Sequence, residues 1–413
     1  MNLPYTYLRG ELHVEGVPFT EIAARHGTPC YVYSETALRS AFQAFDSAFA
    51  SRDHLVCYAV KANSNLSILR LFAELGSGFD IVSGGELARV LAAGGRADRI
   101  VFSGVGKSEA EIRAALEAGI LCFNVESAAE LDRLSRVAAD MKRVAPVSLR
   151  VNPDVDAKTH PYISTGLKEN KFGIPFGEAY DLYQRAARAP GLKVEGIDCH
   201  IGSQLTEIAP FEAALEKVLG LVDRLAASGI ALHHIGVGGG LGIRYRDETP
   251  PPVADYANAL LRLIGDRKAR LLLEPGRLLV GEAGVLLTRV EYLKKGEDRN
   301  FAVVDAAMND LMRPALYEAW HDLKPVREQQ ETAGSTYDVV GPVCETADCL
   351  ARGRTLDLRD GDLVAIMCAG AYGMSMASNY NSRPRPAEVM VAGETMRVVR
   401  ARESLEDLLR NER

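Results

Sequence analysis

The chain has 413 residues, of which 47% are hydrophobic and 25% charged, a composition typical of globular proteins and long enough for two domains. Its formal net charge of -7 is small for this length and it has no basic stretch, so we expect no nucleic-acid partner. No run approaches eighteen apolar residues, which excludes a membrane span, and no secretory signal is expected in the first twenty residues.

The cysteines are scattered along the chain and contain no C-x-x-C pair. This pattern disfavours a disulfide framework or a structural zinc site and suits a reducing cytoplasm, where we expect the protein to reside. Seven cysteines occur, at positions 30, 57, 122, 199, 344, 349 and 368.

Residues 33–285 repeat one unit, a short apolar strand followed by a polar turn and an amphipathic helix. Strands that alternate with helices pair in parallel, and eight of them predict a closed (β/α)8 barrel of the TIM type. The long connection 152–193 is expected to form a lid or an oligomer contact. Ser127 and Glu130 predict a capping box. The predicted strands are 55–60, 79–82, 100–103, 121–125, 147–151, 194–200, 234–237 and 270–274, and the predicted helices are 86–93, 109–118, 127–139, 210–228 and 254–264.

The residues at the ends of the predicted strands are polar or glycine, whereas the strands before them are apolar. In such barrels the carboxyl ends of the strands carry the chemistry. One polar residue of this kind indicates a solvated loop, but a ring of them predicts a lined cavity. The residues are Lys61, Asp80, Gly104, Glu126, Asn152, His200, Gly238 and Glu274.

After about residue 285 the pattern changes to short β-prone runs, which predict a mostly antiparallel sheet. The β-like residues 5–14 are expected to join it, because a barrel that begins near residue 33 leaves them no other partner. We therefore predict a barrel domain over 33–285 and a β-rich domain built from 1–32 together with 286–413. The β-prone runs are 285–293, 301–304, 337–340, 363–367, 388–391 and 396–400.

Lys61 follows an apolar strand and precedes the turn formers Asn63, Ser64 and Asn65. A lysine in this position either reaches solvent or a carboxylate, or is held in a pocket to form a Schiff base with a carbonyl cofactor. The ring of polar strand ends favours the second interpretation.

Three consecutive glycines, Gly238, Gly239 and Gly240, follow the seventh predicted strand. Such a run lets backbone N–H groups approach an anion, and the phosphate site of a barrel typically lies after strands seven and eight. A flexible turn is the alternative. The run is not a Walker loop, because no Gly-Lys-Ser/Thr follows it.

Glu274 closes the eighth predicted strand and should be partly buried, so it needs a partner. Arg277 can be that partner. Alternatively, Glu274 holds a proton on a heteroaromatic nitrogen and leaves Arg277 for a substrate carboxylate. His200, at the end of the sixth strand, is either a satisfied core histidine or lies flat against an aromatic ring, and Ser203 can donate to a phosphate.

The second domain contains three further candidate motifs. Arg313 and Tyr317 lie close in sequence. Cys344, next to Glu345 after a Gly-Pro turn, is either a proton donor or a buried thiol. Tyr372 lies between small residues and either reaches out of the sheet or packs within it.

Six motifs in this order resemble the fold-type III pyridoxal-phosphate enzymes, the group of alanine racemase and the eukaryotic ornithine decarboxylases, and within it most closely the diaminopimelate decarboxylases. They span residues 58–373, nearly the whole chain. The motifs are Tyr-Ala-Val-Lys61-Ala-Asn, His200-Ile-Gly-Ser-Gln, Gly-Gly-Gly at 238–240, Glu274-Pro-Gly-Arg277, Cys344-Glu345-Thr-Ala-Asp and Gly-Ala-Tyr372-Gly.

The resemblance implies that pyridoxal 5'-phosphate is bound as a Schiff base to Lys61, that His200 stacks on its ring and that Glu274 contacts its nitrogen. A carboxylate at this nitrogen makes the ring a strong electron sink, which favours decarboxylation over racemisation. The cofactor-binding residues implied or expected from their strand ends are Lys61, Asp80, His200, Ser203, Gly238, Gly239, Gly240, Glu274, Gly276, Arg277 and Tyr372.

The substrate implied by the resemblance is meso-2,6-diaminopimelate, converted to L-lysine and CO2 in the last step of lysine biosynthesis. Its non-reacting end carries an ammonium and a carboxylate, for which the chain offers Glu345, Arg277, Arg313, Tyr317 and Tyr372. Cys344 would protonate the reacting carbon. In the family, Cys344 and Glu345 reach the neighbouring subunit, which implies a homodimer with shared active sites.

Two alternatives remain open. The protein is a related decarboxylase of ornithine, arginine or carboxynorspermidine, or it is a non-catalytic, cofactor-binding regulatory homologue. The joint presence of Lys61, Cys344 and Glu274 speaks against the second alternative.

Overall fold

The computed structural model describes residues 4–155, 171–329 and 334–412. The chain divides into two compact units, one of residues 42–243 with 249–278 and the other of residues 1–41, 244–248 and 279–413. The sequence-based division into 33–285, and 1–32 with 286–413, stays a prediction. Residues 156–170, in the middle of the connection expected to be a lid, lie outside the described residues.

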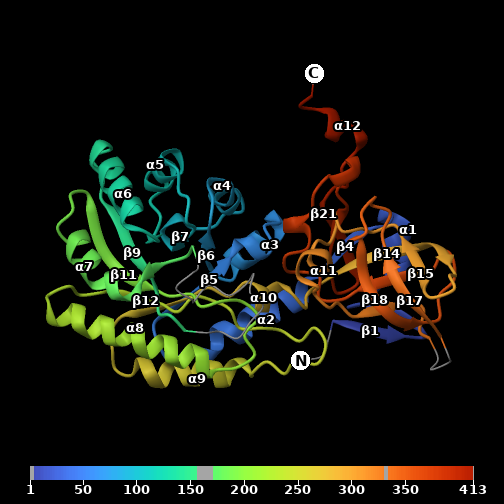
Figure 1. Ribbon diagram of the computed structural model, residues 1–413, viewed down its shortest axis with the longest axis horizontal. Coiled ribbons are helices and arrows are strands. Elements are labelled where there is room, and N and C mark those ends of the chain that lie inside the picture. The colour runs from blue at the N-terminus through green and yellow to red at the C-terminus, as the bar shows by residue number, and fades with distance from the viewer. Residues whose placement is uncertain (1–3, 156–170, 330–333, 413) are drawn as a thin grey trace. The chain divides into compact units, whose positions relative to one another are not determined.

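The first unit is the predicted (β/α)8 barrel (Figure 1). Its parallel strands pair in chain order, and β13 returns to pair with β5, so the ring closes. Short apolar strands buried on both faces suit this architecture. The barrel strands are β5 (His54–Ala59), β6 (Gly78–Ile81), β7 (Ile100–Phe102), β8 (Cys122–Val125), β9 (Ala145–Asn152), β11 (Leu192–Asp198), β12 (His234–Gly236) and β13 (Arg270–Leu273), with β10 (Ile174–Pro175) paired outside β9.

Helices surround the barrel, and α8 and α9 lie side by side on its outer face (Figure 1). The connection 152–193 was predicted as a loop, but it contains β10 and helix α7, so this prediction was wrong for residues 174–186. The barrel helices are α2 (Glu35–Ala48), α3 (Leu66–Glu74), α4 (Gly84–Ala92), α5 (Glu109–Ala118), α6 (Ala128–Asp140), α7 (Phe176–Ala186), α8 (Ala209–Ala227) and α9 (Val253–Ile264).

The capping box predicted at Ser127 and Glu130 is only half formed. The Ser127 side chain accepts from the Glu130 amide, but the Glu130 carboxylate accepts from the Glu126 amide at 2.9 Å and from Lys107 Nζ at 2.6 Å. Because Lys107 is buried, its charge draws Glu130 away from the helix end.

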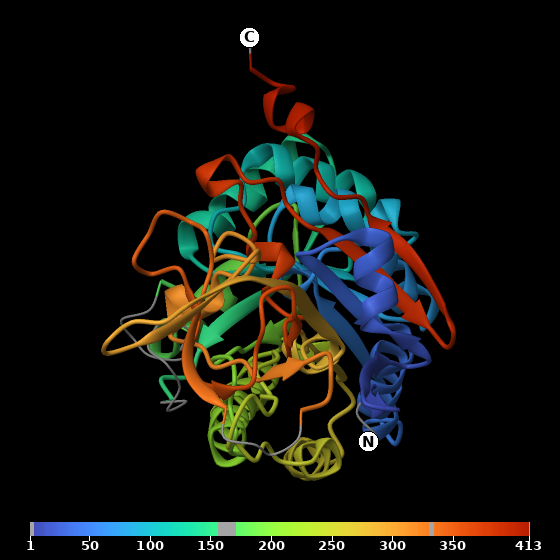
Figure 2. The same ribbon diagram turned by 90° about the vertical axis from the view of Figure 1, so that its right-hand side faces the viewer.

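The second unit is built on a mostly antiparallel sheet, as predicted. β4 lies in its middle, antiparallel to β14 and parallel to β20, so the N-terminal segment (blue) lies beside the C-terminal strands (red) in Figure 2. The pair β15 and β17 is also parallel. The sheet order is β18 (Cys349–Leu356), β17 (Ser335–Val340), β15 (Asn300–Val304), β14 (Gly284–Lys294), β4 (Cys30–Ser34), β20 (Ala387–Ala392) and β21 (Thr395–Arg400), with β19 (Leu363–Ile366) on β14 and β16 (Leu323–Pro325) on β19.

Residues 5–18, before β4, form a separate small sheet rather than one strand of the large sheet. β1 (Tyr5–Leu8), β2 (Glu11–Val14) and β3 (Val17–Pro18) pair as successive hairpins, and the turn at Arg9 and Gly10 interrupts the single run predicted over 5–14. Two short helices, α11 (Arg313–Tyr317) and α12 (Leu405–Leu409), complete this unit together with α1 (Phe19–His26).

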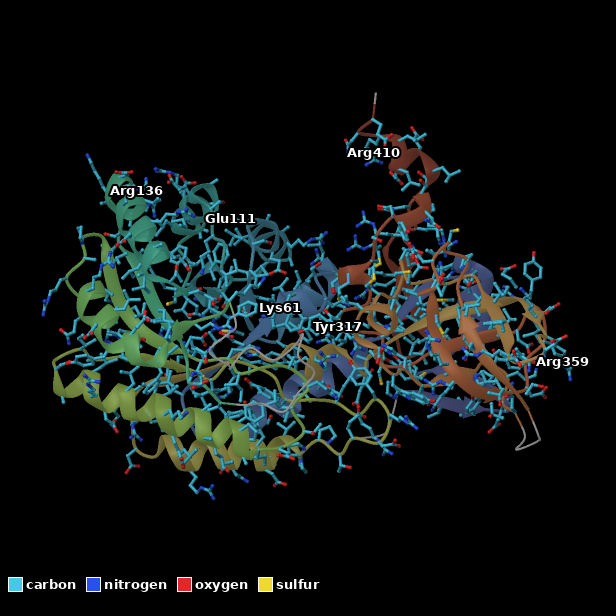
Figure 3. The ribbon with its side chains drawn as sticks, viewed as in Figure 1. Lys61, Glu111, Arg136, Tyr317, Arg359 and Arg410 are labelled. Atoms are coloured by element: carbon cyan, nitrogen blue, oxygen red, sulfur yellow. The ribbon has the colours of Figure 1, made fainter. Side chains whose placement is uncertain are left out.

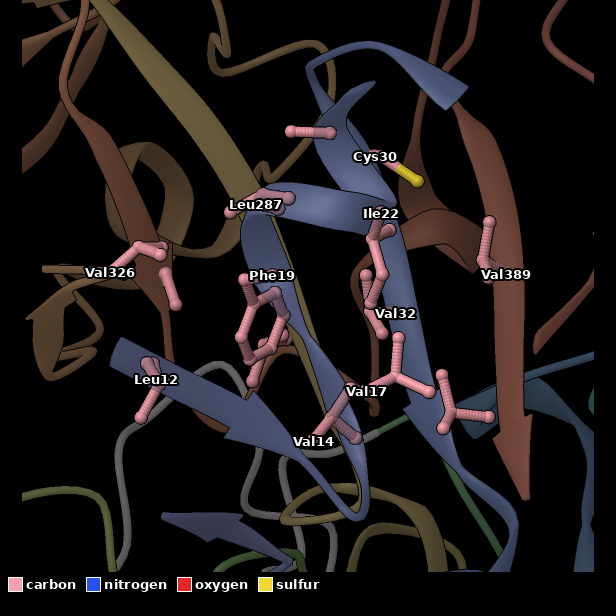
Figure 4. Close-up of a cluster of buried hydrophobic side chains, with 14 of the residues drawn as sticks. Leu12, Val14, Val17, Phe19, Ile22, Cys30, Val32, Leu287, Val326 and Val389 are labelled. Atoms are coloured by element: carbon pink, nitrogen blue, oxygen red, sulfur yellow. The ribbon is translucent and has the colours of Figure 1, made fainter. Parts of the chain in front are cut away.

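An apolar core holds the small sheet, α1 and the large sheet together (Figure 4). Phe19 and Ile22 of α1 pack in the same buried cluster as Val32, Leu287 and Val389 from the central strands. This core fixes the sheet that carries the second set of predicted site residues. No helix within the described ranges has both the length and the apolar character needed to cross a membrane.

Candidate active site

Lys61 lies in a 3-10 turn, η1 (Val60–Ala62), directly after β5, and is marked in Figure 3. Its Nζ donates to Asp80 Oδ2 of β6 at 2.6 Å. The Asp80 side chain is completely buried, whereas 40% of the Lys61 side chain is exposed. The lysine is therefore held at the barrel end by a buried carboxylate and still presents its amine to the surface of the unit.

Glu274 follows β13 and lies in the barrel interior. Burial, with Asp198 and Asp80 as neighbouring like charges, raises the pKa of Glu274 well above its usual range. Asn124 Nδ2 donates to Glu274 Oε1 at 3.4 Å. Burial therefore favours the protonated form of Glu274, which can share its proton with a basic nitrogen.

His200 is neutral, and its tautomer follows from one contact. Burial and the nearby cations Arg150 and Lys61 lower the pKa of His200 well below its usual range. The Gly239 backbone N–H donates to His200 Nδ1 at 3.2 Å. A neutral imidazole has one donor and one acceptor, so the ring proton is on Nε2.

The glycines after β12 can be nothing larger. A Cβ on Gly239 would collide with the Glu274 carbonyl, and one on Gly240 with the Gly202 carbonyl. At Gly238 it would lie 2.7 Å from His200 Nδ1. The backbones of the loops after β11, β12 and β13 therefore lie in direct contact here, and no side chain fits between them.

Arg277 lies at the same end of the barrel. Its Nη2 donates to Ser203 Oγ at 3.0 Å, so the loop after β11 and the loop after β13 are joined. Gly276 packs against the strand end that precedes Lys61, because a Cβ there would lie 3.1 Å from the Cβ atoms of Ala59 and Ala62. The barrel unit therefore brings together its whole predicted set, from Lys61 and Asp80 to Arg277.

The remaining predicted residues lie in the second unit. Cys344 is exposed, which removes the alternative of a buried thiol, and its backbone N–H donates to Asn381 Oδ1 at 2.8 Å. Glu345 accepts from Tyr380 OH at 2.6 Å. The buried Asp348 accepts from the amides of Met308 and Val343, both at 2.7 Å, and so fixes the loop that presents Cys344 and Glu345.

Arg313 is buried at the start of α11, and Tyr317 is half-buried at its end. Tyr372 has a left-handed backbone with φ of 56°, which is strained for a residue with a side chain. The adjacent Gly370 and Gly373 are required, since a Cβ on either would collide with backbone of the same unit. A strained aromatic residue between two sterically fixed glycines is typical of a functional position.

Sequence reasoning missed a charged layer inside the barrel. Arg150 of β9 donates to Glu126 Oε1 at 2.9 Å, and Asp198 is aligned with Arg150 on the neighbouring strand β11. Neither Asp198 oxygen accepts a hydrogen bond within the described part of the chain, and the Cys199 amide beside it donates to the Gly236 carbonyl instead. Asp198 stands two residues before His200, on the same face of the strand, and this spacing was the signal that could have found it.

Comparison with known proteins identifies the family. Residues 35–281 match the family model of the pyridoxal-dependent decarboxylases, pyridoxal binding domain. The chain is 60% identical over 401 residues to a diaminopimelate decarboxylase of Neisseria meningitidis serogroup B, with 97% of each chain covered, and 58% identical over 408 residues to that of Pseudomonas aeruginosa, with 99% of this chain and 98% of the relative covered. The chain belongs to the diaminopimelate decarboxylases.

The fold agrees with this family. The solved structure of diaminopimelate decarboxylase from Helicobacter pylori, complexed with L-lysine, superposes with a TM-score of 0.92 at 46% identity and covers 95% of this chain and 99% of that one. Diaminopimelate decarboxylases are carboxy-lyases that depend on pyridoxal phosphate, so the predicted cofactor is confirmed.

The residues of the barrel unit fit this cofactor. Its aldehyde needs an amine, which Lys61 presents, and its basic ring nitrogen needs a buried acid, which Glu274 provides. Its phosphate needs backbone N–H groups without side chains in the way, and the Gly238–Gly240 loop is closed to every larger residue. Asp80 Oδ1 is buried and accepts no hydrogen bond within the described ranges, so this oxygen of the Lys61–Asp80 pair remains available as an acceptor.

The unpaired Asp198 makes stability depend on pH. Burial raises its pKa to about 6, above the usual 3.8, so the folded protein binds this proton more tightly than the unfolded chain does. The free energy of unfolding therefore falls as the pH rises from 3.8 to 6 and stays low above it. Replacing Asp198 by Asn should increase that free energy by about 3 kcal/mol at pH 8 and by about half as much at pH 5.

Urea unfolding of the parent and of Asp198→Asn at the two pH values measures this difference. The exposed Asp266 supplies the control, because Asp266→Asn changes no buried charge. If Asp198→Asn increased the free energy of unfolding by the same amount at pH 5 and pH 8, the assignment of Asp198 as an unpaired buried carboxyl would be wrong.

Proposed function

We propose that this chain decarboxylates meso-2,6-diaminopimelate to L-lysine and CO2, the last step of lysine biosynthesis. The observation that carries the proposal is the 60% identity over 97% of the chain to a diaminopimelate decarboxylase. The Lys61–Asp80 pair and the buried Glu274, whose pKa is raised, supply the chemical support, since both suit a pyridoxal-phosphate site.

In this proposal each barrel residue has one task. Bound pyridoxal phosphate supplies the electron sink that accepts the electron pair left when the C–C bond to the departing carboxylate breaks. Lys61 holds the cofactor aldehyde through its Nζ, and Glu274 keeps a proton at the ring nitrogen. His200 stacks the flat face of its neutral imidazole on the cofactor ring. Because the imidazole is neutral, it does not repel the positive charge of the protonated ring nitrogen.

The phosphate lies against the Gly238–Gly240 loop, in which the Gly239 N–H donates to His200, with Gly276, Ser203 and Tyr372 around it. The Ser203 hydroxyl accepts from Arg277, which orients its own proton away from that guanidinium and toward an incoming anion. The arrangement binds the phosphate without a P-loop lysine.

The second unit supplies substrate contacts and the final proton. The Cys344 thiol donates its proton to the carbon that has lost its carboxylate, and the exposed position of Cys344 allows this. Arg313, with Arg277, Tyr317 and Tyr372, binds the non-reacting carboxylate, and Glu345 binds the ammonium beside it. A site built on paired charges rejects a substrate that lacks one partner by about 10⁴-fold.

The active unit in this proposal is a homodimer in the cytoplasm, with a cofactor-binding domain over 33–285 and a β-rich domain over 1–32 and 286–413. Cys344 and Glu345 then reach the barrel of the neighbouring subunit. The exposure of Cys344 on a loop that Asp348 holds in place supports this arrangement.

Turnover with four substrates tests the function. The purified protein with pyridoxal phosphate should release CO2 and L-lysine from meso-diaminopimelate, while kcat/KM for ornithine, arginine and carboxynorspermidine should be lower by about 10⁴-fold or more. Lys61→Ala should reduce release from meso-diaminopimelate to background. Preference for another of the four would assign a related decarboxylase, and cofactor binding without CO2 release from any would assign a regulatory homologue.

Mixing two inactive variants tests the shared site. Lys61→Ala and Cys344→Ala, each inactive alone, should regain about a quarter of the parental activity after co-refolding, because half of the dimers are mixed and each has one intact site. Co-refolded Lys61→Ala with itself is the control. If the mixture sediments as dimers but regains no activity, Lys61 and Cys344 of one subunit serve the same active site and the shared site is wrong.

A further inference from the structure

Arg313 is held by two aromatic neighbours of its own unit. Its guanidinium carbon lies 4.5 Å from the centroid of the Tyr245 ring, and its Nη1 lies 2.8 Å from His321 Nε2. The Tyr245 and His321 rings meet edge to face with centroids 5.4 Å apart. All three side chains are buried, and His321 is completely so. The guanidinium is thus fixed both on its face and at its edge.

The protonation of His321 follows from its partners. A guanidinium has only donors, so His321 Nε2 must be the acceptor of the 2.8 Å contact. The proton of the neutral ring is then on Nδ1, which donates to the Met367 carbonyl at 2.8 Å. Both ring nitrogens are used, in one tautomer only, and a doubly protonated ring cannot accept from Arg313.

His321 is itself fixed by the end of a strand ladder. Strands β16 and β19 are antiparallel, and Leu323 pairs with Ile366 at the end of their ladder. One residue further along, the Met367 N–H donates to the Asp322 carbonyl at 2.8 Å, directly beside His321. Arg354 Nη2 also donates to the His321 carbonyl at 2.8 Å. The imidazole is therefore a rigid link between the large sheet and the guanidinium at the start of α11.

We propose that His321, with Tyr245 below the guanidinium, is a positioning residue that aims Arg313 at the non-reacting carboxylate and so sets the preference for substrates that carry one. This inference rests on the proposed function, in which Arg313 binds that carboxylate. His321 does not touch the reacting atoms. Its contribution is to reduce the freedom of a long side chain before the substrate arrives.

Two ligands that differ by one carboxylate measure this effect. L-lysine keeps the carboxylate of the non-reacting end, and 1,5-diaminopentane lacks it. Calorimetric titration of the holoenzyme with each gives an affinity ratio that reports the carboxylate contact and needs no turnover.

Two substitutions separate positioning from folding. His321→Gln keeps an acceptor near the Nε2 position and loses the donor to Met367, whereas His321→Asn keeps a donor near Nδ1 and loses the acceptor for Arg313. We expect His321→Asn to weaken L-lysine binding about tenfold and to leave 1,5-diaminopentane binding unchanged, while His321→Gln retains most of the ratio. The decarboxylation assay should show the same change as an increased KM with kcat nearly unchanged.

Two further variants complete the experiment. His234→Asn removes another buried imidazole, in the barrel, and should leave the ratio at its parental value. Arg313→Ala should remove the preference for L-lysine over 1,5-diaminopentane. If Arg313→Ala abolishes it but His321→Asn does not change it, the positioning role is wrong and the proposed function stands. If Arg313→Ala also leaves it unchanged, the contact assigned to Arg313 is wrong and the inference fails with it.

Discussion

The ion pair between Lys61 and Asp80 is the interaction on which the barrel site depends. A completely buried carboxylate is costly unless a cation faces it, and the Lys61 amine lies 2.6 Å away. The same requirement places the amine at the carboxyl end of β5, among the loops that follow β11, β12 and β13. Replacing Lys61 would leave the buried Asp80 carboxylate without this cation at the centre of the site.

Around this pair the barrel concentrates acidic groups that stability alone would avoid. Burial, with Asp198 and Asp80 as neighbouring like charges, raises the pKa of Glu274, and Asp198 has no hydrogen-bond partner within the described ranges. Groups held in unfavourable surroundings are characteristic of active sites, where a perturbed pKa serves the reaction. The second unit follows a different rule, since its site residues are held by well-paired neighbours such as Asp348 and His321.

The sequence was sufficient for the barrel and the second sheet, because each depends on a local pattern, whereas the roles assigned to the site residues stay predictions. Apolar runs alternating with amphipathic helices predict the barrel, and glycines that admit no Cβ mark the loop after β12. Helix α7 has an amphipathic pattern of its own, but it lies in a connection interpreted as a loop. β18 was missed because three of its eight residues are exposed and Gly353, at positive φ, interrupts its pattern.

Side-chain pairs between residues distant in sequence could not be predicted from the sequence. The pairing of Arg150 with Glu126, of Lys107 with Glu130 and of Arg313 with His321 joins residues from different elements, and no local spacing encodes it. The same limit explains the half-formed capping box, where the buried Lys107, from the loop before α5, competes for the carboxylate. Sequence patterns locate the groups, and the fold decides which groups meet.

Reductive trapping shows which lysine holds the cofactor. The holoenzyme is treated with borohydride, digested and examined by mass spectrometry for the peptide that contains Lys61. We expect Lys61, and not Lys107, to carry the reduced pyridoxyl phosphate, and we expect Asp80→Asn to reduce the yield of this modified peptide. An unmodified Lys61 in a protein that has bound the cofactor would contradict it.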